Sequence, residues 1–584
     1  MPSDRSPASS SPLHCDLLVI GSGAGGLSAA VTAARLGLSV VVAEKQARLG
    51  GTTAWSGGWM WIPRNPLAVE AGIQEPLEEP LGYLRHELGE RFDEARARAY
   101  LENGPRMIEF FRTRTALRFI DGNAIPDFHG RSPHAREGGR SVCAAPFDGR
   151  RLGARMADLE PPLPETTLWG MGIASGAELR HYINALRSPA SFAYVARRVL
   201  ALARDRLLHG RSMRLVNGNA LAGALLASAA EAGVDLRTRS PASRLLTREG
   251  AEGVGVSGAV LETPQGPLEV HARHGVLLAC GGFPHDPERK KALLPHDPTG
   301  QCHWSAAARG NTGDGLRLGE AAGAPVSHDL VQAAALAPVS RVPRTDGSLC
   351  HFPHLIDRAK PGLIAVRSDG LRFVNEAESY HDFMQALLRA TPAGETAQAW
   401  LVCDHAFIRR YGLGAAKPAP FSLRPWLRNG YLRRGRSLAQ LAAACGIDAA
   451  ALERTVARYN AQAQGGRDED FAKGETPYNR MQGDAAYARE RGWPNPCMAP
   501  LQRGPFYAVQ VVPGSLGTFA GLRTDAHARV LDAQGVPIAG LYASGADQSS
   551  VMGGNYPSGG ITLGPAMTFG FIAAHHAAGM SPSL

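Results

Sequence analysis

The stretch from Cys15 to Gly58, CDLLVIGSGAGGLSAAVTAARLGLSVVVAEKQARLGGTTAWSGG, decides the fold expected for this chain. An apolar run over residues 17–20 predicts a short buried strand. Gly21, Gly23 and Gly26 follow it with G-x-G-x-x-G spacing. These glycines allow a tight turn, a close approach of pyrophosphate to the backbone and close packing of a helix on the strand. The stretch therefore predicts a dinucleotide site whose phosphates bind at a helix N-terminus.

A carboxylate ends the next predicted strand, at residues 40–43, beyond a helix expected over residues 25–36. Glu44 stands where an acid can accept hydrogen bonds from both hydroxyls of an adenosine ribose and would repel a 2′-phosphate. Glycine-rich turns also occur in ordinary loops, so an ordinary βαβ unit is the alternative interpretation. That alternative has no use for the acid, and we therefore favour the dinucleotide site.

Two further segments favour FAD over a nicotinamide cofactor. Residues 49–58, LGGTTAWSGG, are mostly small or hydroxyl-bearing, as expected where a longer cofactor passes close to the backbone. Residues 540–547, GLYASGAD, predict a strand that ends in glycine, and Asp547 is expected to bind hydroxyls of the ribityl chain. The sequence shows no second nicotinamide-binding unit, in which a strand, a glycine-rich turn and a helix follow one another, so we expect reduced flavin to pass its electrons to an external acceptor, a quinone or similar compound.

The residues expected to contact FAD come from these segments and from the double glycine that closes a predicted strand over residues 275–283. They are Gly21, Ser22, Gly23, Ala24, Gly25, Gly26, Glu44, Lys45, Gly51, Thr52, Thr53, Ser56, Gly57, Gly58, Gly281, Gly545, Asp547 and Leu563. Both ends of the chain are thus expected to meet on one long ligand.

Charge and cysteine content narrow the class of protein. The 584 residues carry a formal net charge of +9, with basic stretches over residues 180–214 and 409–436. We interpret these stretches as solvated helix faces, and peripheral contact with an anionic membrane stays open. No recognition motif accompanies them, so we expect no nucleic-acid partner. The eight cysteines lack the spacing of a metal site, which predicts no metal and a cytoplasmic protein with reduced thiols.

The expected fold class is α/β, with a discontinuous Rossmann-like FAD-binding domain and an inserted α+β cap domain that carries catalytic residues. We expect a disordered N-terminus over residues 1–13, which lacks the apolar segment of a signal peptide. The FAD-binding domain is expected over residues 14–284 and 501–584, and the cap over residues 285–500. Strand character returns at residues 505–513 and 536–544, whereas residues 438–463 predict a helix with a polar face.

Five motifs together resemble a family of flavoproteins that groups fumarate reductase and succinate dehydrogenase subunits with 3-ketosteroid dehydrogenases. They are GSGAGG at 21–26, GGTTAWSGG at 50–58, GNTGDG at 310–315, RFVNEAESY at 372–380 and GGNYPSGGITLGPAMTF at 553–569. The resemblance covers most of the chain. It implies FAD, a discontinuous flavin domain and a mobile cap with the substrate between the two.

Two tyrosines decide which branch of the family this chain is similar to. Fumarate reductases of the family clamp a dicarboxylate with two arginines, but the matching positions here hold Tyr380 and Tyr556, and a phenol cannot replace a guanidinium fork. The chain therefore most resembles the Δ1-type 3-ketosteroid dehydrogenases, which act on a bulky cyclic ketone. Their pattern implies that Tyr380 is the base and that Tyr556, with Gly560, binds the C3 carbonyl.

The implied chemistry is coherent. A carbonyl oxygen held by the Tyr556 hydroxyl and the Gly560 N–H makes the neighbouring carbon acidic, because both donors stabilise the developing enolate. Deprotonated Tyr380 then takes the α-proton while the next carbon delivers a hydride to flavin N5. Because the ordinary pKa of tyrosine is about 10, some group must lower that of Tyr380, and the sequence names none.

One departure from the family pattern keeps the regiochemistry open. The Δ1-enzymes carry a further tyrosine in an N-terminal loop, where this chain has Phe128 and His129, both expected to contact the substrate. Ser558 matches instead a serine of the Δ4-(5α) steroid dehydrogenases and is a further catalytic candidate. Another ketone dehydrogenase or ene-reductase of the family and a flavoprotein without turnover are the remaining alternatives. Since Thr52 and Thr53 stand where some relatives have a flavin-linked histidine, we expect noncovalent FAD.

Overall fold

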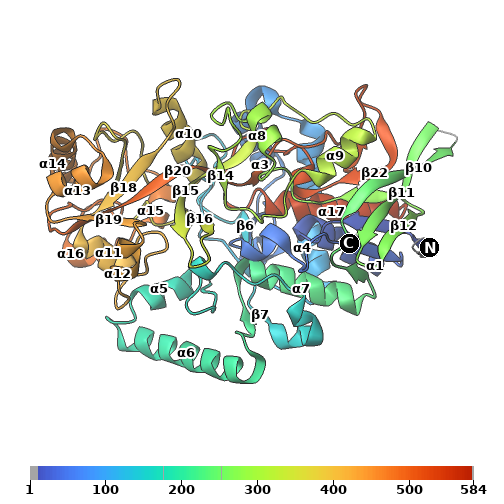
Figure 1. The fold of residues 1–584 in the computed structure, drawn as a ribbon, viewed down its shortest axis with the longest axis horizontal. Helices are drawn as coiled ribbons and strands as arrows, with labels where there is room; N and C mark the ends of the chain where they lie inside the picture. Colours follow the sequence, from blue (N-terminus) through green and yellow to red (C-terminus); the bar gives the residue numbers. More distant parts are fainter. Residues whose placement is uncertain (1–10, 175, 251–252, 582–584) are drawn as a thin grey trace, which may run out of the picture.

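A computed structural model describes residues 11–174, 176–250 and 253–581. The disorder expected over residues 1–13 therefore lies mainly outside the described residues, and the first described strand begins at Leu13. Two large sheets follow one another along the long axis of the molecule, and the two ends of the described chain lie at the same end of it (Figure 1).

A six-stranded sheet of order β21-β22-β13-β2-β3-β9 is the centre of the first half. All of its neighbouring strands are parallel except the edge strand β21. The bounds are β2 Leu17–Ile20, β3 Val40–Ala43, β9 Asp235–Arg237, β13 Val276–Leu278, β21 Arg529–Leu531 and β22 Pro537–Ala543. Because β22 pairs with β13 and β13 with β2, the sheet joins both ends of the chain. The predicted discontinuous α/β fold is confirmed.

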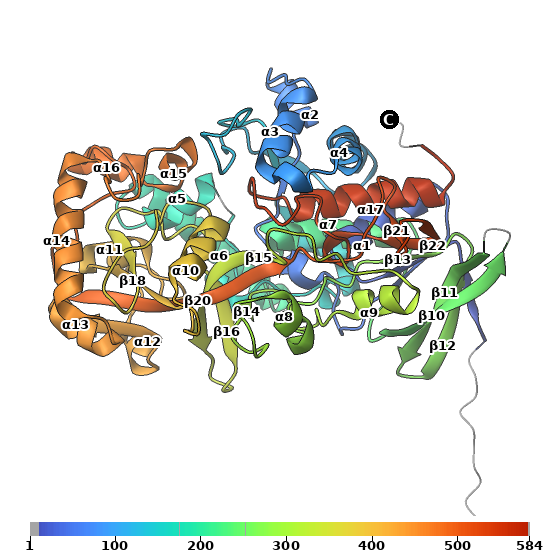
Figure 2. The same ribbon diagram turned by 90° about the horizontal axis from the view of Figure 1, so that it is seen from above.

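Helices rich in small residues pack tightly beside this sheet. They are α1 (Ala24–Arg35), α7 (Asn217–Glu231) and α17 (Leu563–Ala577). The long α4 (Glu94–Arg114), which has mostly larger residues, packs on α17, and Figure 2 shows the four helices grouped together. The first ten residues of α1 are buried. A Cβ at Gly570 of α17 would come within 2.5 Å of the Gly25 carbonyl oxygen, so glycine is what lets α17 approach α1. This approach brings the C-terminal helix onto the G-x-G-x-x-G segment.

Smaller elements surround the six-stranded sheet. A four-stranded sheet has the order β1-β12-β11-β10, and short sheets pair β4 with β6, β5 with β6, and β7 with β8. The strand bounds are β1 Leu13–Cys15, β4 Trp59–Trp61, β5 Phe119–Asp121, β6 Ser141–Ala144, β7 Phe147–Asp148, β8 Arg214–Leu215, β10 Ala242–Gly250, β11 Gly253–Thr263 and β12 Gly266–Ala272. The helices around the sheet are α2 Pro66–Glu70, α3 Glu78–Leu88, α8 Pro287–Leu293 and α9 Asp314–Ala321, whereas α5 Ala177–Ile183 and α6 Pro189–His209 pack on each other away from it.

The second half is built on a seven-stranded sheet of order β16-β15-β20-β18-β17, with β14 and β19 also paired to β20. Its strands are β14 Trp304–Ser305, β15 Ala334–Pro343, β16 Leu349–Pro353, β17 Leu363–Val366, β18 Ala399–Cys403, β19 Leu432–Gly435 and β20 Phe506–Thr518. The helices of this half are α10 Tyr380–Ala390, α11 His405–Tyr411, α12 Arg424–Arg428, α13 Leu438–Cys445, α14 Ala449–Gly465, α15 Pro477–Gln482 and α16 Ala485–Arg491.

Two features of the second half differ from the sequence prediction. Strand β20 pairs with cap strands, although residues 501–584 were expected in the FAD-binding domain, so the chain returns to the six-stranded sheet only at β21. The helix expected over residues 438–463 is two helices, α13 and α14, because Gly446 adopts a left-handed conformation between them.

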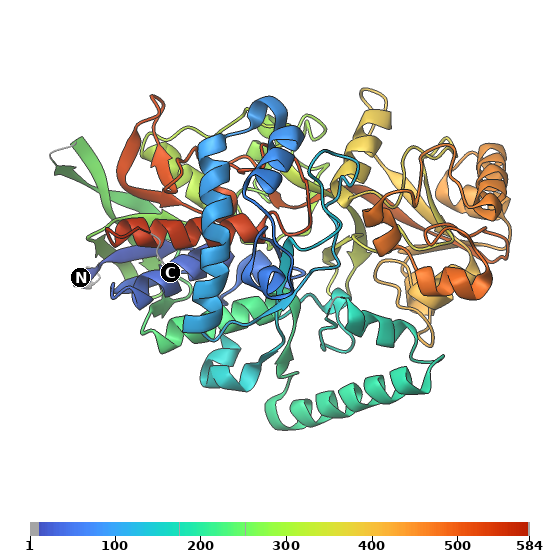
Figure 3. The same cartoon turned by 180° about the vertical axis from the view of Figure 1, so that it is seen from behind.

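The helix α6 stands apart from both sheets. It lies below α5 in Figure 1, and the view from behind in Figure 3 shows the same separation. Only Ser191, Leu202 and Asp205 are buried along its 21 residues. Within the described residues, no helix combines the length and apolarity needed to cross a membrane.

Candidate active site

One continuous cavity of about 1320 Å³ runs between the two halves of the molecule. Its walls come from the G-x-G-x-x-G segment, the loop over residues 51–58, the N-terminus of α7 and the loops around β13 and β22. Cap residues from β16, α10, α15 and α16 close the other side. The cavity thus lies where the sequence predicts a cofactor and a substrate to meet.

The G-x-G-x-x-G turn has the geometry of a dinucleotide cradle. Gly21 has a φ of +108°, and a Cβ there would lie 2.1 Å from the Ala279 carbonyl oxygen. Gly23 is the N-cap of α1, and a Cβ there would have no neighbour closer than the Thr53 hydroxyl, at 3.5 Å. The helix N-terminus therefore faces the cavity with its backbone open to an anion.

Glu44 lies at the end of β3, beside this turn. One carboxylate oxygen accepts hydrogen bonds from the Ser22 hydroxyl at 2.6 Å and the Ser22 N–H at 3.2 Å, and the other accepts from the Gln46 N–H at 2.9 Å. Glu44 is partly exposed to the cavity. This placement fits a carboxylate that binds ribose hydroxyls.

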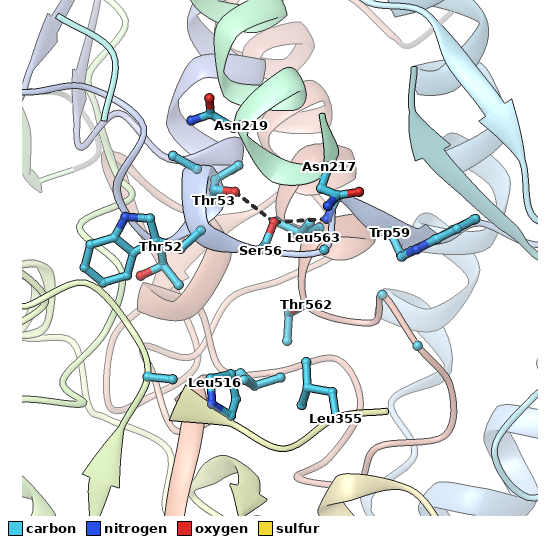
Figure 4. A pocket seen from close by; sticks show the side chains of 18 of the residues that line it. Thr52, Thr53, Ser56, Trp59, Asn217, Asn219, Leu355, Leu516, Thr562 and Leu563 are labelled. Carbon is cyan, nitrogen blue, oxygen red and sulfur yellow. Dashed lines mark hydrogen bonds between the residues drawn. The ribbon is translucent and has the colours of Figure 1, made fainter. Parts of the chain in front are cut away.

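Most of the predicted cofactor contacts line the cavity. They are Gly21, Ser22, Gly23, Ala24, Gly25, Glu44, Lys45, Gly51, Thr52, Thr53, Ser56, Gly57, Gly58, Gly281, Gly545 and Leu563. Figure 4 shows Thr52, Thr53 and Ser56 on one wall, with Leu355 and Leu516 facing them across the cavity. The donor set and the shape of the turn therefore fit FAD.

Two predicted cofactor contacts have packing roles instead. A Cβ at Gly26 would lie 2.0 Å from the Gly21 carbonyl oxygen, so Gly26 permits the tight turn from inside the fold. Asp547 is fully buried and accepts hydrogen bonds from the N–H groups of Cys280 (2.5 Å) and Gly282 (2.9 Å). Asp547 thus holds the double-glycine turn after β13, and neither residue lines the cavity.

The cradle is tied to the second half of the chain by hydroxyl contacts. The Thr52 hydroxyl accepts hydrogen bonds from the Ala308 N–H at 2.9 Å and the Asn311 side chain at 3.1 Å. The Lys45 ammonium bonds the Thr312 hydroxyl at 2.8 Å and pairs with Asp314. The GNTGDG turn therefore packs directly on the predicted flavin loop.

Four aromatic rings meet further along the cavity. The rings of Tyr380 and Tyr556 are 5.0 Å apart, edge to face, and Phe128 lies 5.6 Å from Tyr380 and 5.8 Å from Tyr556. Tyr478 of α15 is 4.5 Å from Phe128. Segments 176 residues apart in sequence, at α10 and at the C-terminal glycine loop, thus bring the two predicted tyrosines together.

Tyr380 and Tyr556 are buried, and burial raises the pKa of both hydroxyl groups. Burial raises the pKa of Tyr380 well above its ordinary value, and a hydrogen bond with Tyr556 raises it further. The guanidinium of Arg358 acts in the opposite direction on the pKa of Tyr380 and of Tyr478. Arg358 is buried and donates to the carbonyl oxygens of Glu376 (2.9 Å) and Glu378 (3.1 Å), just before α10. Arg358 thus opposes the effect of burial on the pKa of Tyr380 without outweighing it.

Gly560 lies at the same wall of the cavity. It has a φ of +100°, and a Cβ there would come within 2.7–2.8 Å of the Met60 backbone. Its carbonyl oxygen accepts from the Trp61 and Gly564 N–H groups. Over residues 11–174, 176–250 and 253–581, no acceptor engages the Gly560 N–H, which leaves this donor for a ligand.

This combination of cradle and tyrosines agrees with comparisons to known proteins. The family model described as FAD binding domain matches residues 16–563. The chain belongs to this family. A 3-oxosteroid 1-dehydrogenase of Mycobacterium tuberculosis is 36% identical over 96% of this chain and 98% of the relative. A 4-oxocyclohex-2-ene-1-carboxylate 5-dehydrogenase of Sinomonas cyclohexanicum is 38% identical over 97% of this chain and 94% of the relative.

A solved structure is similar over the whole length. It is a 3-ketosteroid delta1-dehydrogenase from Sterolibacterium denitrificans in complex with 1,4-androstadiene-3,17-dione, with a TM-score of 0.89 and 37% identity, covering 97% of this chain and 99% of that chain. The resemblance to Δ1-type 3-ketosteroid dehydrogenases is confirmed, and with it an FAD-dependent oxidoreductase.

Two residues predicted for the substrate site of this FAD family member have other partners. His129 lies between Glu87, which bonds its Nδ1, and Asp382, which is 2.9 Å from its Nε2. Burial lowers the pKa of His129, but hydrogen bonds with these two carboxylates outweigh it and raise the pKa to about 11. Ser558 is buried and bonds Asp127. Neither residue lines the cavity, in contrast to the substrate contact expected for His129 and the catalytic role expected for Ser558.

The sequence did not identify most of the apolar wall. Phe352, Leu355, Leu516, Phe519 and Tyr478 line the cavity near the tyrosines. They come from β16, the loop after it, β20 and α15, and no short motif connects them. Only pairing of β20 with cap strands, which the sequence did not reveal, brings these side chains to one wall.

Proposed function

We propose that this protein is an FAD-dependent dehydrogenase that introduces a double bond between C1 and C2 of ring A of a 3-ketosteroid. The observation that carries the proposal is the meeting of Tyr380, Tyr556 and Gly560 on one apolar section of the cavity. The proposal also draws on relatives that act on 3-oxosteroids.

Each of these residues has a distinct task. The Tyr556 hydroxyl and the Gly560 N–H donate to the ketone oxygen and stabilise negative charge that develops there. Tyr380, with its phenol beside Tyr556, takes the proton from the adjacent carbon. Phe128 and the apolar wall exclude water from the ring. FAD, when bound in the cradle, supplies the hydride acceptor.

A second candidate is a dehydrogenase of smaller ring ketones, favoured by the 38% identical relative that acts on an oxocyclohexene carboxylate. A compact carboxylate substrate would need a cation that lines the cavity beside the tyrosines, and Arg358 does not line it. The cavity wall around the tyrosines is apolar and aromatic, which fits fused hydrocarbon rings better. Δ4-(5α) dehydrogenation would place the double bond elsewhere in ring A, and the partnership of Ser558 with Asp127 weakens it.

Anaerobic reduction of the bound flavin tests the proposal. Androst-4-ene-3,17-dione should bleach the flavin of the holoenzyme and yield the 1,4-diene, identified by mass and NMR. We expect 4-oxocyclohexanecarboxylate to react with a kcat/KM at least tenfold lower. Tyr556→Phe should keep FAD and lose about 10²–10³ in kcat/KM. Absence of bleaching by any 3-ketosteroid would overturn the proposal.

We also infer that reduced flavin passes its electrons to an external acceptor, a quinone or similar compound. The cytoplasmic location stays a prediction. We further infer that the protein makes peripheral contact with an anionic membrane. The contact surface is α6, where Phe192, Leu200 and Leu207 lie on one helix face at spacings of eight and seven residues. Leu200 is 71% and Leu207 is 86% exposed. Arginines such as Arg197 and Arg204 flank this face, as expected for a helix lying in a bilayer interface.

Vesicle sedimentation tests this contact. The protein should sediment with phosphatidylglycerol vesicles and much less with phosphatidylcholine vesicles. Replacing Leu200 and Leu207 together with serine should abolish sedimentation but leave flavin bleaching in solution unchanged. Unchanged sedimentation of this variant would show that α6 is not the contact.

A further inference from the structure

The cavity continues beyond the tyrosines to an opening bordered by α5, α15 and α16, which lie close together in Figure 2. Four basic side chains line this end: Arg180 of α5, Lys360, Arg480 of α15 and Arg489 of α16. We call them the cationic mouth. The three arginines are exposed, whereas Lys360 is partly buried.

The cationic mouth carries charge that its neighbours do not neutralise. Within the described parts of the chain, none of its four members forms an ion pair with a carboxylate. Two acids also line this end, and both act on the pKa of Lys360, but their short contacts are with other residues and they are outnumbered by the four basic side chains. Asp357 accepts from His354 at 2.7 Å, and Asp484 is paired with Arg410 at 3.1 Å. The opening therefore presents a local excess of positive charge.

Lys360 is the most constrained member of the cationic mouth. Its ammonium donates to the carbonyl oxygens of Gln482 (2.5 Å) and Gly483 (2.9 Å), in the turn between α15 and α16. These bonds fix the nitrogen at the cavity wall and use two of its three N–H groups. Burial lowers the pKa of Lys360, the carboxylates of Asp484 and Asp357 act in the opposite direction, and nearby Arg180 adds to the lowering. An anionic ligand would relieve both costs.

The wall between the cationic mouth and the tyrosines is apolar. Phe352, Leu355, Ile356 and Met481 line it. A ligand that fills the cavity must therefore have an apolar body with a ketone at one end. Its other end meets arginine and lysine, which are donors that match a carboxylate.

We propose that the natural substrate is a ring ketone with a carboxylate at its remote end, and that the cationic mouth binds this carboxylate. The inference rests on the proposed dehydrogenase function and names its substrate class. An anionic lipid phosphate offers the same chemistry, so the experiment must separate the two sources.

Paired substrates test the proposal on the holoenzyme. The first is a 3-oxo-4-ene steroid whose side chain ends in a carboxylate, and the second is its methyl ester. The acid should have a kcat/KM about tenfold above that of the ester, the size of one charge-assisted hydrogen bond. Lys360→Met and, separately, Arg180→Gln should remove most of this preference, because the KM for the acid should rise far more than the KM for the ester.

The control variant is Arg428→Gln. Arg428 is an exposed arginine of α12 that does not line the cavity, so this change lowers net charge equally but should keep the preference for the acid. Equal kcat/KM for acid and ester in the wild type would overturn the proposal. So would a Lys360→Met variant that loses activity toward both substrates alike while keeping FAD.

Two further outcomes would separate failure of the substrate proposal from failure of the proposed dehydrogenase function. If the preference for the acid is absent, and Lys360→Met or Arg180→Gln weakens sedimentation with phosphatidylglycerol vesicles, the cationic mouth binds lipid phosphate and the substrate proposal falls. If acid, ester and androst-4-ene-3,17-dione all fail to bleach the flavin, the proposed dehydrogenase function itself is wrong.

Discussion

Tyr380 must lose its proton to act as a base, yet its surroundings oppose this loss. Burial and the bond with Tyr556 raise its pKa, so the reactive phenolate becomes more abundant as pH rises. We expect kcat/KM for a 3-ketosteroid to increase with pH between about 6 and 10. Stopped-flow measurement of flavin reduction at each pH gives this dependence. Tyr380→Phe should lose about 10²–10⁴ in rate at all pH values. A flat wild-type profile would contradict this role.

Arg358 is the positioned cation that opposes the effect of burial on Tyr380. Arg358→Gln removes the charge, so the rise of kcat/KM should move to higher pH. Arg358→Lys keeps the charge but loses the forked contacts to the Glu376 and Glu378 carbonyls, so its profile should stay near that of the wild type with a lower kcat. Profiles that shift equally in the two variants would indicate a purely structural role.

At the scale of single residues, the sequence was informative where a residue lies in a short motif. Tyr380 and Tyr556 were found because each lies in a short motif, and both line the cavity. Arg358 and Tyr478 lie in segments without a motif, so nothing in the sequence linked them to Tyr380. His129 was misread because its two carboxylate partners come from α3 and α10, distant in sequence.

The glycine loop before α17 positions the carbonyl-binding N–H. Gly560→Ala would place a Cβ against the Met60 backbone in a conformation that alanine rarely adopts. The loop must shift, and we expect a loss of about 10² in kcat/KM with FAD retained. Gly579→Ala is the matched control, since Gly579 also has positive φ (+67°) but open space around its Cβ position. Equal losses in both variants would argue against a specific role for the loop.

Elements were predicted well where periodicity and turn residues agreed. The strands at 17–20 and 40–43 have the expected bounds, and the first helix differs by one residue. The assignment of β20 was wrong because an apolar strand carries no signal for its partner sheet. The sheet that β20 joins is decided by its pairing with distant strands, and the apolar wall of the cavity depends on this pairing.

At the scale of the whole molecule, a group of buried and partly buried histidines joins β14 to strands β16 and β20 within the seven-stranded sheet. His303 is 3.0 Å from His296 and 2.9 Å from the Ser515 hydroxyl on β20, and His351 bonds the Ser305 carbonyl oxygen. Burial lowers the pKa of His296 and His351 to about 4 and that of His303 well below its ordinary value. The folded state therefore keeps these rings neutral.

This group predicts acid sensitivity. The unfolded chain takes up protons below the ordinary histidine pKa of about 6.5, whereas the folded chain does not until about pH 4. Stability is complete above pH 6.5 and falls as pH decreases toward 4, by about 1.4 kcal/mol per pKa unit for each ring. Thermal melts at pH 8 and pH 5 should show a drop in Tm that His296→Asn makes smaller. An equal drop in that variant would exclude His296 as a source.

The hydroxyl of Thr52 and the ammonium of Lys45 interlock the FAD cradle with the GNTGDG turn. Residues 308–314 therefore belong with the cradle when the cap is exchanged between homologues. A chimaera whose grafted segment begins before residue 308 would have to bring matching partners for both side chains, or its cofactor would dissociate during purification.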